Sequence, residues 1–256
     1  MDNSRPKKSL GQHFLRDENI ARKIVGFLNS EKAGYIIEIG PGNGVLTKYI
    51  FARKEVPSVA VEIDPGRVEF LRNEFPGMEG QIIHGDFLKF DLSAFKSPVA
   101  VIGNFPYNIS SQIFFRILEN RNIITEVVCM IQKEVAERLS AGPGKKTYGI
   151  LSVLLQAYYN IEYLFSVTPE VFYPKPKVHS AVIRLKRNKI NELDCDENLF
   201  FRIVKACFNQ RRKTIRNSMK KITDSLVATS DLLSKRPEQL NVEQFVELTR
   251  LIQSTI

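Results

Sequence analysis

The stretch GYIIEIGPGNG, residues 34–44, is a short apolar run that ends in three glycines and leads into a segment of helical periodicity. Glycines at such a strand-to-helix turn let the backbone turn tightly and approach a ligand closely. Because Val45 follows the G-x-G-x-G spacing, the G-x-G-x-x-G pattern of nicotinamide and flavin sites is not met. Glu38, just before Gly40 and Gly42, disfavours a pyrophosphate and suits a cationic ligand, such as the amino acid end of S-adenosylmethionine.

Strand-like apolar runs and helix-period segments alternate through most of the chain. Five strands are predicted, over residues 34–39, 58–63, 81–84, 99–102 and 126–131. Helices are predicted over residues 45–53, 65–75, 110–118 and 148–159. This order predicts a mainly parallel sheet with helices on both faces. Two more strands, at 161–167 and 178–186, are joined by a proline-containing link, so we expect them at an antiparallel edge.

Two acidic residues follow the glycine turn at the ends of successive predicted strands. Glu62 closes the second strand, where a carboxylate can accept both ribose hydroxyls, and Asp86 follows the third, where it can accept from an adenine amine. Taken singly, such carboxylates are often helix N-caps. With Glu38, which directly precedes the G-x-G-x-G turn, they make three acidic residues in strand order, and this pattern predicts a domain that binds S-adenosylmethionine.

After residue 186 the pattern changes to helices alone, predicted over 199–207, 211–221 and 242–252. A polar stretch, NKINELDCDE at 188–197, precedes them. We therefore predict a Rossmann-like α/β domain of the class I S-adenosylmethionine-dependent methyltransferase type over residues 1–187, which includes a basic arm at 1–16. A small all-helical, RNA-binding domain is predicted over residues 188–256.

The reacting site is predicted at Asn104-Phe105-Pro106-Tyr107, after the fourth strand and at the sheet edge that binds ligands. The side-chain oxygen of Asn104 and the carbonyl of Phe105 can both accept from an exocyclic aromatic amine. That contact favours the pyramidal geometry in which the nitrogen lone pair can attack, and Tyr107 offers a stacking face. A proline turn with an asparagine cap is the structural alternative.

A second aromatic candidate is Phe172, in the proline-rich stretch VFYPKPK at 171–177. Prolines stiffen this loop, which could hold the ring against the other face of a base; a plain core side chain is the alternative. Lys175 and Lys177 would then lie beside the phosphates of the same strand.

The net charge of +9 has two positive contributions, +3 from the arm and +8 from residues 184–221, while residues 17–183 are neutral and residues 222–256 carry −2. This distribution favours a polyanion held at two places, although a solvated surface is the other explanation. The predicted helix over 211–221 would place several basic side chains on one side, where they can contact phosphates. These candidates are Arg211, Arg212, Lys213, Arg216, Lys220 and Lys221.

Several classes of protein and site are excluded by what the sequence lacks. No apolar stretch approaches about 20 residues, and no apolar run follows the basic amino terminus, so neither a membrane helix nor a signal peptide is predicted. Three cysteines without C-x-x-C spacing and three scattered histidines predict neither a disulfide framework nor a metal site. Residues 144–147 lack the earlier glycine of a phosphate-binding loop. We expect a cytoplasmic protein.

Eight stretches together resemble the small-subunit ribosomal RNA adenine N6,N6-dimethyltransferases, the KsgA family, along nearly the whole chain. They are KKSLGQHFL (7–15), EIGPGNG (38–44), VEID (61–64), HGDF (84–87), NFPYNISS (104–111), KTYGILSVL (146–154), VFYPKPKVHSAVIRL (171–185) and FNQRRKTIRNSM (208–219). The glycine loop is generic, whereas the NFPY turn, GQHFL and the last two stretches are specific to this family. Position 13 is His where many relatives have Asn, and position 105 is Phe where Leu is common.

The resemblance implies roles for particular residues. It implies that Gln12, His13 and Leu15 fold over the methionine end of S-adenosylmethionine. Cofactor contacts are further implied for Gly40, Glu62, Asp86 and Asn104. The target adenine would be received by Asn104, Phe105 and Tyr107, with Phe172 opposite.

The activity that the resemblance implies is the methylation, twice each, of two adjacent adenosines in the 3′-terminal hairpin loop of 16S rRNA. The partner would be the precursor of the small ribosomal subunit, and the enzyme a monomer with a role in ribosome biogenesis. One alternative is the antibiotic-resistance methyltransferase of 23S rRNA, which shares the cofactor motifs. Another is a non-catalytic assembly factor with this fold, which the intact candidate site disfavours. A DNA adenine methyltransferase would more often carry D-P-P-Y.

Overall fold

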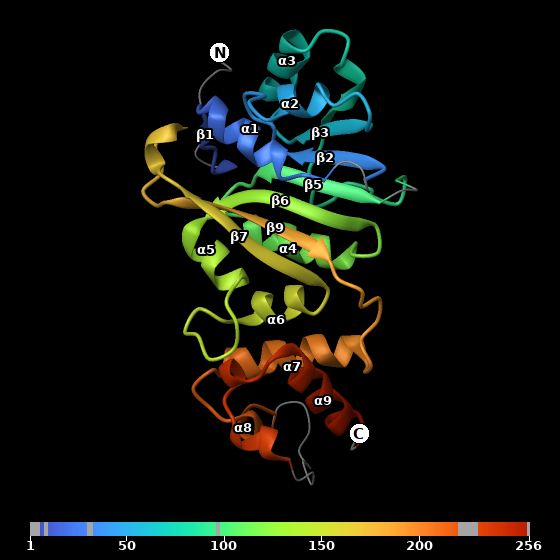
Figure 1. Ribbon diagram of the computed structural model, residues 1–256, viewed down its shortest axis with the longest axis vertical. Coiled ribbons are helices and arrows are strands. Elements are labelled where there is room, and N and C mark those ends of the chain that lie inside the picture. The colour runs from blue at the N-terminus through green and yellow to red at the C-terminus, as the bar shows by residue number, and fades with distance from the viewer. Residues whose placement is uncertain (1–5, 8–9, 30–32, 96–97, 220–229, 255–256) are drawn as a thin grey trace. The chain divides into compact units, whose positions relative to one another are not determined.

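The computed structural model describes residues 6–7, 10–29, 33–95, 98–219 and 230–254. The chain forms two compact units (Figure 1). The sheet unit comprises residues 1–136 and 161–187, and the helical unit comprises residues 137–160 and 188–256.

A seven-stranded sheet runs in the order β4-β3-β2-β5-β6-β9-β7. Its strands are β2 (Tyr35–Ile39), β3 (Ser58–Glu62), β4 (Ile82–His84), β5 (Val99–Asn104), β6 (Ile124–Gln132), β7 (Tyr159–Val167) and β9 (Ser180–Arg187). The strands from β4 to β6 are parallel, whereas β9 is antiparallel to β6. The structure confirms the predicted Rossmann-like α/β fold. The strand order reverses between β2 and β5, which is where open α/β sheets bind ligands.

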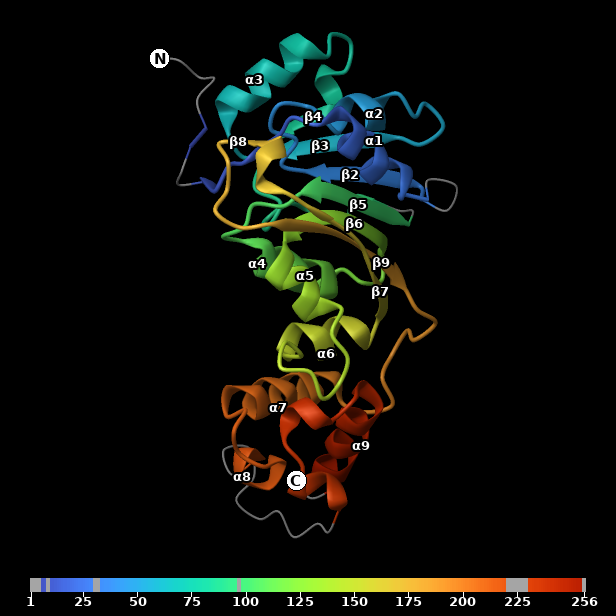
Figure 2. The same ribbon diagram turned by 60° about the vertical axis from the view of Figure 1, so that its left-hand side comes forward.

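Helices cover both faces of this sheet (Figure 2). Those on one face are α1 (Glu18–Gly26), α2 (Thr47–Phe51) and α3 (Pro65–Glu74), and α4 (Ser110–Glu119) lies on the other. Buried side chains of the first three, among them Ile24, Ile50 and Leu71, pack with Ile36 and Ala60 of the strands. Because alternate strand residues face opposite sides, this core occupies one face of the sheet.

Two very short strands, β1 (Phe14–Leu15) and β8 (Phe172–Tyr173), pair antiparallel and join the amino-terminal arm to the segment before β9. Phe14 lies opposite Tyr173, and Leu15 lies opposite Phe172. Neither strand was predicted, because two residues are too few to show a periodic pattern. Helix α1 was also missed, although Asp17 is a clear N-cap that accepts from the backbone amides of Asn19 and Ile20.

In the helical unit, α7 (Glu197–Asn209) contacts α6 (Ile150–Gln156), α8 (Ile215–Met219) and α9 (Val242–Gln253). Helix α5 (Lys133–Leu139) leads the chain from the sheet unit into this one. Residues 137–160 belong to the helical unit, whereas the boundary predicted at 188 assigned them to the first domain. Periodicity predicts that α6 is a helix, but only tertiary packing decides that its buried residues pack on α7.

The single helix predicted over residues 211–221 is wrong. Helix α7 ends at Asn209, a turn follows in which Lys213 donates to the Gln210 carbonyl, and α8 begins at Ile215. The backbone amide of Ile215 donates to Lys235, so α8 is held by the segment that follows it in the chain. Arg211, Arg212 and Lys213 therefore precede α8, and the predicted stripe of charge along one helix does not form. Lys220 and Lys221 lie outside the described residues.

Candidate functional site

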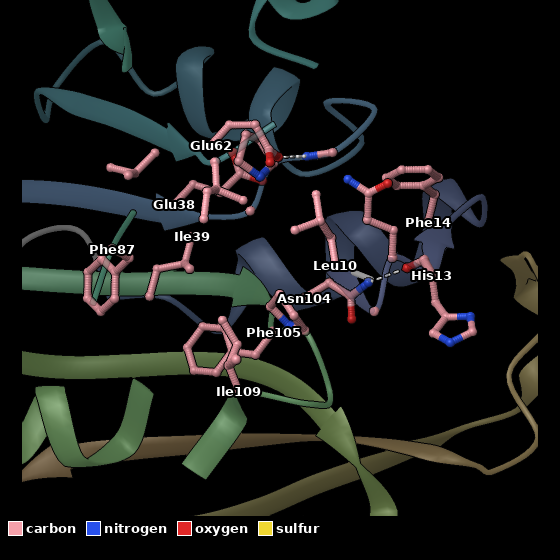
Figure 3. A pocket seen from close by; sticks show the side chains of 18 of the residues that line it. Leu10, His13, Phe14, Glu38, Ile39, Glu62, Phe87, Asn104, Phe105 and Ile109 are labelled. Carbon is pink, nitrogen blue, oxygen red and sulfur yellow. Dashed lines mark hydrogen bonds between the residues drawn. The ribbon is translucent and has the colours of Figure 1, made fainter. Parts of the chain in front are cut away.

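A cavity opens at the carboxyl ends of β2, β3, β4 and β5, where the strand order reverses (Figure 3). Eleven of the predicted catalytic and cofactor-binding residues line it. They are Gln12, His13, Leu15, Glu38, Gly40, Gly42, Glu62, Asp86, Asn104, Phe105 and Tyr107. The remaining candidate, Phe172, does not line the cavity. The arrangement gathers residues that are far apart in the sequence because parallel strands end at one edge of the sheet.

The glycine turn bends through the left-handed backbone region. Gly40, Gly42 and Gly44 have φ values of 63°, 58° and 78°, which favour glycine. A Cβ atom at Gly42 would come within 2.8 Å of the Phe14 ring, so the turn packs directly against β1. At Gly40 the nearest atom to a Cβ would be Pro106 Cδ, at 4.0 Å, which leaves open space beside the cavity.

Glu62 joins the glycine turn to the start of α3. Its carboxylate is buried and accepts from the backbone amide of Gly42 at 3.2 Å and from that of Asp64 at 2.9 Å. Burial raises the pKa of Glu62, and these two amides partly oppose that shift. Since a carboxylate can accept about four hydrogen bonds, acceptor capacity remains for hydroxyl groups in the cavity. Asp86 similarly accepts from the Leu88 amide, at 2.9 Å, through its Oδ1 atom.

Glu38 is a buried carboxylate in the cavity wall. It is 1% exposed and accepts from the Thr47 hydroxyl at 2.7 Å. Burial raises the pKa of Glu38 to about 8, and the neighbouring Glu62 adds to the shift, whereas the Thr47 hydrogen bond opposes it. A cation that enters beside Glu38 would therefore gain a partner that ionises in response.

Replacing Glu38 with glutamine is expected to remove a pH dependence from the stability of the cofactor-free protein. The folded state holds the Glu38 proton up to about pH 8, whereas unfolded glutamate loses its proton near pH 4.5. The contribution to the free energy of unfolding is therefore fully present below about pH 4.5 and is lost as pH rises toward 8, by at most about 1.4 kcal/mol per pH unit.

Urea unfolding of wild type and Glu38→Gln at several pH values between 5 and 8 tests this expectation. Glutamine does not titrate, so the difference between the two proteins isolates Glu38 from the other carboxylates. The variant should gain stability relative to wild type as pH rises. A constant difference across the range would contradict a buried, protonated Glu38.

Asp64, which was not predicted as a site residue, holds the amino-terminal arm beside the cavity. Lys7 Nζ contacts one carboxylate oxygen at 2.7 Å, and Gln12 Nε2 donates to the other at 3.3 Å. Burial opposes ionisation of Asp64, but the bonds from Lys7, Gly66 and Gln12 hold its pKa below the usual value. Gln12 Oε1 accepts from the Lys7 amide, so the polar atoms of Gln12 stabilise the arm. The signal available in the sequence was Asp64-Pro65, a helix start.

Asn104, at the end of β5, has one side-chain polar atom that forms a hydrogen bond and one for which no partner is found among the described residues. Its Nδ2 donates to the His13 carbonyl at 2.7 Å (Figure 3). Its Oδ1 is buried, and no donor in the described part of the chain reaches it. The His13 carbonyl can accept but not donate, which sets the orientation of the amide. An acceptor oxygen is thus held in the cavity wall and left free for a donor from outside the protein.

Tyr107 is oriented by two contacts. Its hydroxyl and that of Ser180 form a hydrogen bond of 2.5 Å, and its ring stacks on His13 with centroids 5.3 Å apart. His13 Nδ1 in turn donates to the Pro174 carbonyl at 2.7 Å. The Phe105 ring is 1% exposed and packs on Phe114, so Phe105 can act in the cavity only through its backbone.

Phe172 lies in the hydrophobic core and is 4% exposed. Of the two roles that the sequence left open for Phe172, the structure shows the core side chain. Phe172 pairs with Leu15 across the β1–β8 ladder, and both side chains lie in the same hydrophobic core. Lys175 forms an ion pair with Glu170 at 2.7 Å, which lowers the pKa of Glu170 to about 2. Lys177 is exposed.

The basic residues of the helical unit differ in their surroundings. Arg211 donates to the Lys145 carbonyl at 3.2 Å and lies 3.7 Å from Glu238, so it holds two segments of the unit together. Arg212, Lys213 and Arg216 are exposed.

Within the described residues, no three potential metal ligands cluster. None of the helices described is long and apolar enough to cross a membrane.

The polar groups of the cavity fit S-adenosylmethionine, which combines a cationic amino acid end, two ribose hydroxyls and an adenine. Glu38, Glu62 and Asp86 supply carboxylates at the ends of successive strands, and Gly40 leaves space beside them. Apolar side chains of Ile39 and Phe87 also line the cavity. Such a mixture of apolar walls and a few placed polar groups is typical of a cofactor site.

Comparisons with known proteins agree with this fit. The family model described as ribosomal RNA adenine dimethylase matches residues 3–253. Ribosomal RNA small subunit methyltransferase A of Parabacteroides distasonis is 54% identical over 252 residues, which cover 97% of this chain and 94% of that protein. The protein of the same name from Porphyromonas gingivalis is 52% identical and covers 96% of this chain and 97% of its own length.

Solved structures show the same fold. A dimethyladenosine transferase from Plasmodium falciparum superimposes with a TM-score of 0.78 at 20% identity, covering 94% of this chain and 98% of that one. The 23S rRNA methyltransferase ErmE superimposes with a TM-score of 0.69 at 25% identity, covering 93% and 99%. With the family model matched almost end to end and relatives above half identity, the chain belongs to the ribosomal RNA adenine dimethylase family and is an S-adenosylmethionine-dependent methyltransferase.

Proposed function

We propose that this enzyme transfers methyl groups from S-adenosylmethionine to the N6 amines of two adjacent adenosines in the 3′-terminal hairpin loop of 16S rRNA, giving N6,N6-dimethyladenosine. The observation that carries the proposal is the buried, unpartnered Oδ1 of Asn104, which the His13 carbonyl orients in the cavity wall. An exocyclic amine is a donor that matches this acceptor.

In this reaction the protein has mainly to orient the amine toward the methyl group and to stabilise the positive charge that develops on the amine nitrogen. When bound, S-adenosylmethionine supplies a methyl group on a positively charged sulfur, which is a good leaving group. Asn104 Oδ1 accepts from the adenine amine and, with the Phe105 carbonyl, favours the nitrogen geometry whose lone pair points away from the ring. This contact strengthens as the nitrogen gains positive charge, which is the condition for a catalytic effect. The displaced amine proton leaves to solvent.

Cofactor contacts follow from the same cavity. In the proposal Glu62 accepts the ribose hydroxyls, Asp86 accepts from the adenine amine through its second oxygen, and Glu38 faces the cationic amino acid end. His13 and Leu15 line the cavity from the arm, which Gln12 and Asp64 hold in place.

The small ribosomal subunit is favoured as the substrate over the large one. The relatives above half identity carry small-subunit names, whereas ErmE, named for 23S rRNA, is 25% identical. The finer proposal is that the enzyme acts as a monomer in the cytoplasm, on a precursor of the subunit, during ribosome biogenesis. A target base must be unstacked to reach Asn104, which is easiest in a hairpin loop.

The test is the transfer of labelled methyl groups to small subunits purified from cells that lack this mark, with large subunits in parallel and nucleoside analysis of the product. Dimethyladenosine in the small subunit alone is expected. Label in the large subunit alone would favour the resistance-type activity. Tight subunit binding without any label would indicate an assembly factor that has lost the reaction.

We also infer that the helical unit contributes to RNA binding, through phosphate contacts that do not read sequence. Replacing Arg212 and Lys213 together with alanine is expected to weaken RNA binding. The plot of log K against log salt, which has a negative slope, should become less steep by about 1.5, since each lost phosphate contact removes about 0.7–0.9 from the magnitude of the slope. Both side chains are exposed, whereas Arg211 is left unchanged because it holds the fold of its unit.

Binding of small subunits at several salt concentrations measures this slope. Arg202→Ala, another exposed arginine of the helical unit, on α7, is the matched control. A double variant with the wild-type slope would show that the turn before α8 faces away from the RNA.

A further inference from the structure

Tyr173 is the most exposed large hydrophobic side chain among the described residues, with 51% of its surface accessible. Its ring is nevertheless held in place, because the guanidinium of Arg16 lies over it, 4.2 Å from the centroid. A cation over an aromatic ring is stabilising, and it orients the ring without burying it. The result is a supported aromatic surface open to solvent.

A continuous set of contacts connects Tyr173 to the N-F-P-Y turn. Tyr173 pairs across the β1–β8 ladder with Phe14, which lines the cavity. The next residue, Pro174, accepts from His13 Nδ1 at 2.7 Å, and the His13 ring stacks on Tyr107. Tyr173 does not itself line the cavity, but these contacts join its strand to the turn that contains Asn104.

The alternation of side chains along β8 decides which of its two aromatic rings can meet a ligand. Phe172 points into the core with Leu15, so it has no face free for a base. Tyr173, one residue further, points to the opposite side of the strand and into solvent. The sequence predicted Phe172 as the stacking residue of this stretch, whereas the structure exposes the ring of Tyr173 instead.

The charges around Tyr173 complement a nucleic acid. Arg16, which contacts the ring, and Lys177, four residues after Tyr173 in the chain, are both exposed cations. The stretch from 171 to 180 contains no acidic residue. Lys175, in contrast, is paired with Glu170. An aromatic surface beside exposed cations is the combination that binds a single strand, since the ring stacks a base while the cations contact its phosphates.

We propose that Tyr173, supported by Arg16, stacks the base adjacent to the adenosine whose amine lies at Asn104. The proposal rests on the proposed function, in which the target has an adenosine as its neighbour. Stacking of that neighbour holds the loop open while one base occupies the cavity. It also keeps the second adenosine unpaired for its own transfer.

The kinetic test uses Tyr173→Ala and Tyr173→Phe with unmethylated small subunits as substrate. Alanine is expected to raise the KM for the subunit about tenfold, as removal of one stacking ring does elsewhere. It should change kcat much less and leave the dissociation constant of S-adenosylmethionine unchanged. Phenylalanine keeps the ring and is expected to restore the wild-type KM. Phe70→Ala is the matched control, because Phe70 is 40% exposed on α3 and does not line the cavity.

A binding test separates this proposal from the proposed function. A short single-stranded RNA with 2-aminopurine next to an adenosine should lose fluorescence when it binds wild type or Tyr173→Phe, because stacking quenches 2-aminopurine. Tyr173→Ala should bind it more weakly and quench it less. Equal KM and equal quenching for alanine and wild type would overturn the stacking role, as would failure of phenylalanine to restore them. Quenching without methylation by wild type would instead count against the proposed function alone.

Discussion

Asn104→Ala is expected to lower kcat for methyl transfer by about 10²–10³-fold, the usual effect of removing one preorganised hydrogen-bonding group from a reacting centre. The reason is the buried Oδ1, which no described donor reaches and which the Nδ2–His13 hydrogen bond orients. Alanine removes the acceptor for the amine but leaves the glycine turn, Glu62 and Asp86 in place. Binding of S-adenosylmethionine should therefore change much less than kcat.

Single-turnover methylation of small subunits and calorimetric titration of the cofactor measure the two quantities separately. Asn120→Ala is the matched control, since Asn120 also donates through its side chain to a backbone carbonyl, that of Arg116, at the end of α4. Asn104→Asp keeps an acceptor oxygen but loses the donor to His13, so it separates the two contacts of the amide. Near-native turnover by Asn104→Ala would refute the amine-acceptor role.

Glu62→Ala is expected to weaken the binding of S-adenosylmethionine by about 100-fold or more, because two hydrogen bonds to a carboxylate contribute about 1.5–3 kcal/mol each. The variant should also lose about 2 kcal/mol of unfolding free energy, since the Gly42 and Asp64 amides lose their buried acceptor. The glycine turn and the start of α3 are both held by this one side chain.

Cofactor titration and urea unfolding test the two effects in the same protein. Glu119→Ala removes a carboxylate that is 64% exposed and forms a surface ion pair with Arg116, so the unfolding free energy of this variant should stay within about 0.5 kcal/mol of wild type. Cofactor affinity in Glu62→Ala close to that of wild type would show that the ribose contacts come from elsewhere in the cavity.

The sequence predicted the cavity well because its residues follow strand ends. The glycine turn follows β2, Glu62 ends β3, Asp86 follows β4 and Asn104 ends β5. Parallel strands place their carboxyl ends at one edge, so the order of elements alone is enough to bring these residues together. The same order predicted the mainly parallel sheet, and the proline-containing link before residue 178 predicted antiparallel pairing, which β9 shows with β6.

Predictions that depended on the direction of a side chain or on a tertiary partner were less successful. The helix predicted through Arg211 is interrupted because α8 is held by the Lys235 carbonyl. Gln12 lines the cavity as predicted, but its hydrogen bond to Asp64 could not be read from the sequence. Residues 137–160 were assigned to the first domain, although α6 packs in the helical unit.

Sequence alone therefore determined the fold class, the cofactor and the place of the Asn104–Tyr107 turn at the cavity, because short stretches of residues are enough to set strand order and local backbone freedom. Tertiary structure decided which polar atoms are already satisfied and which remain free. Asn104 Oδ1 is left without a donor, whereas the carboxylate of Asp64 is taken by Lys7 and Gln12. It also decided that Phe172 is core and Tyr173 exposed, since only the pairing of β8 with β1 sets which face of that strand meets solvent.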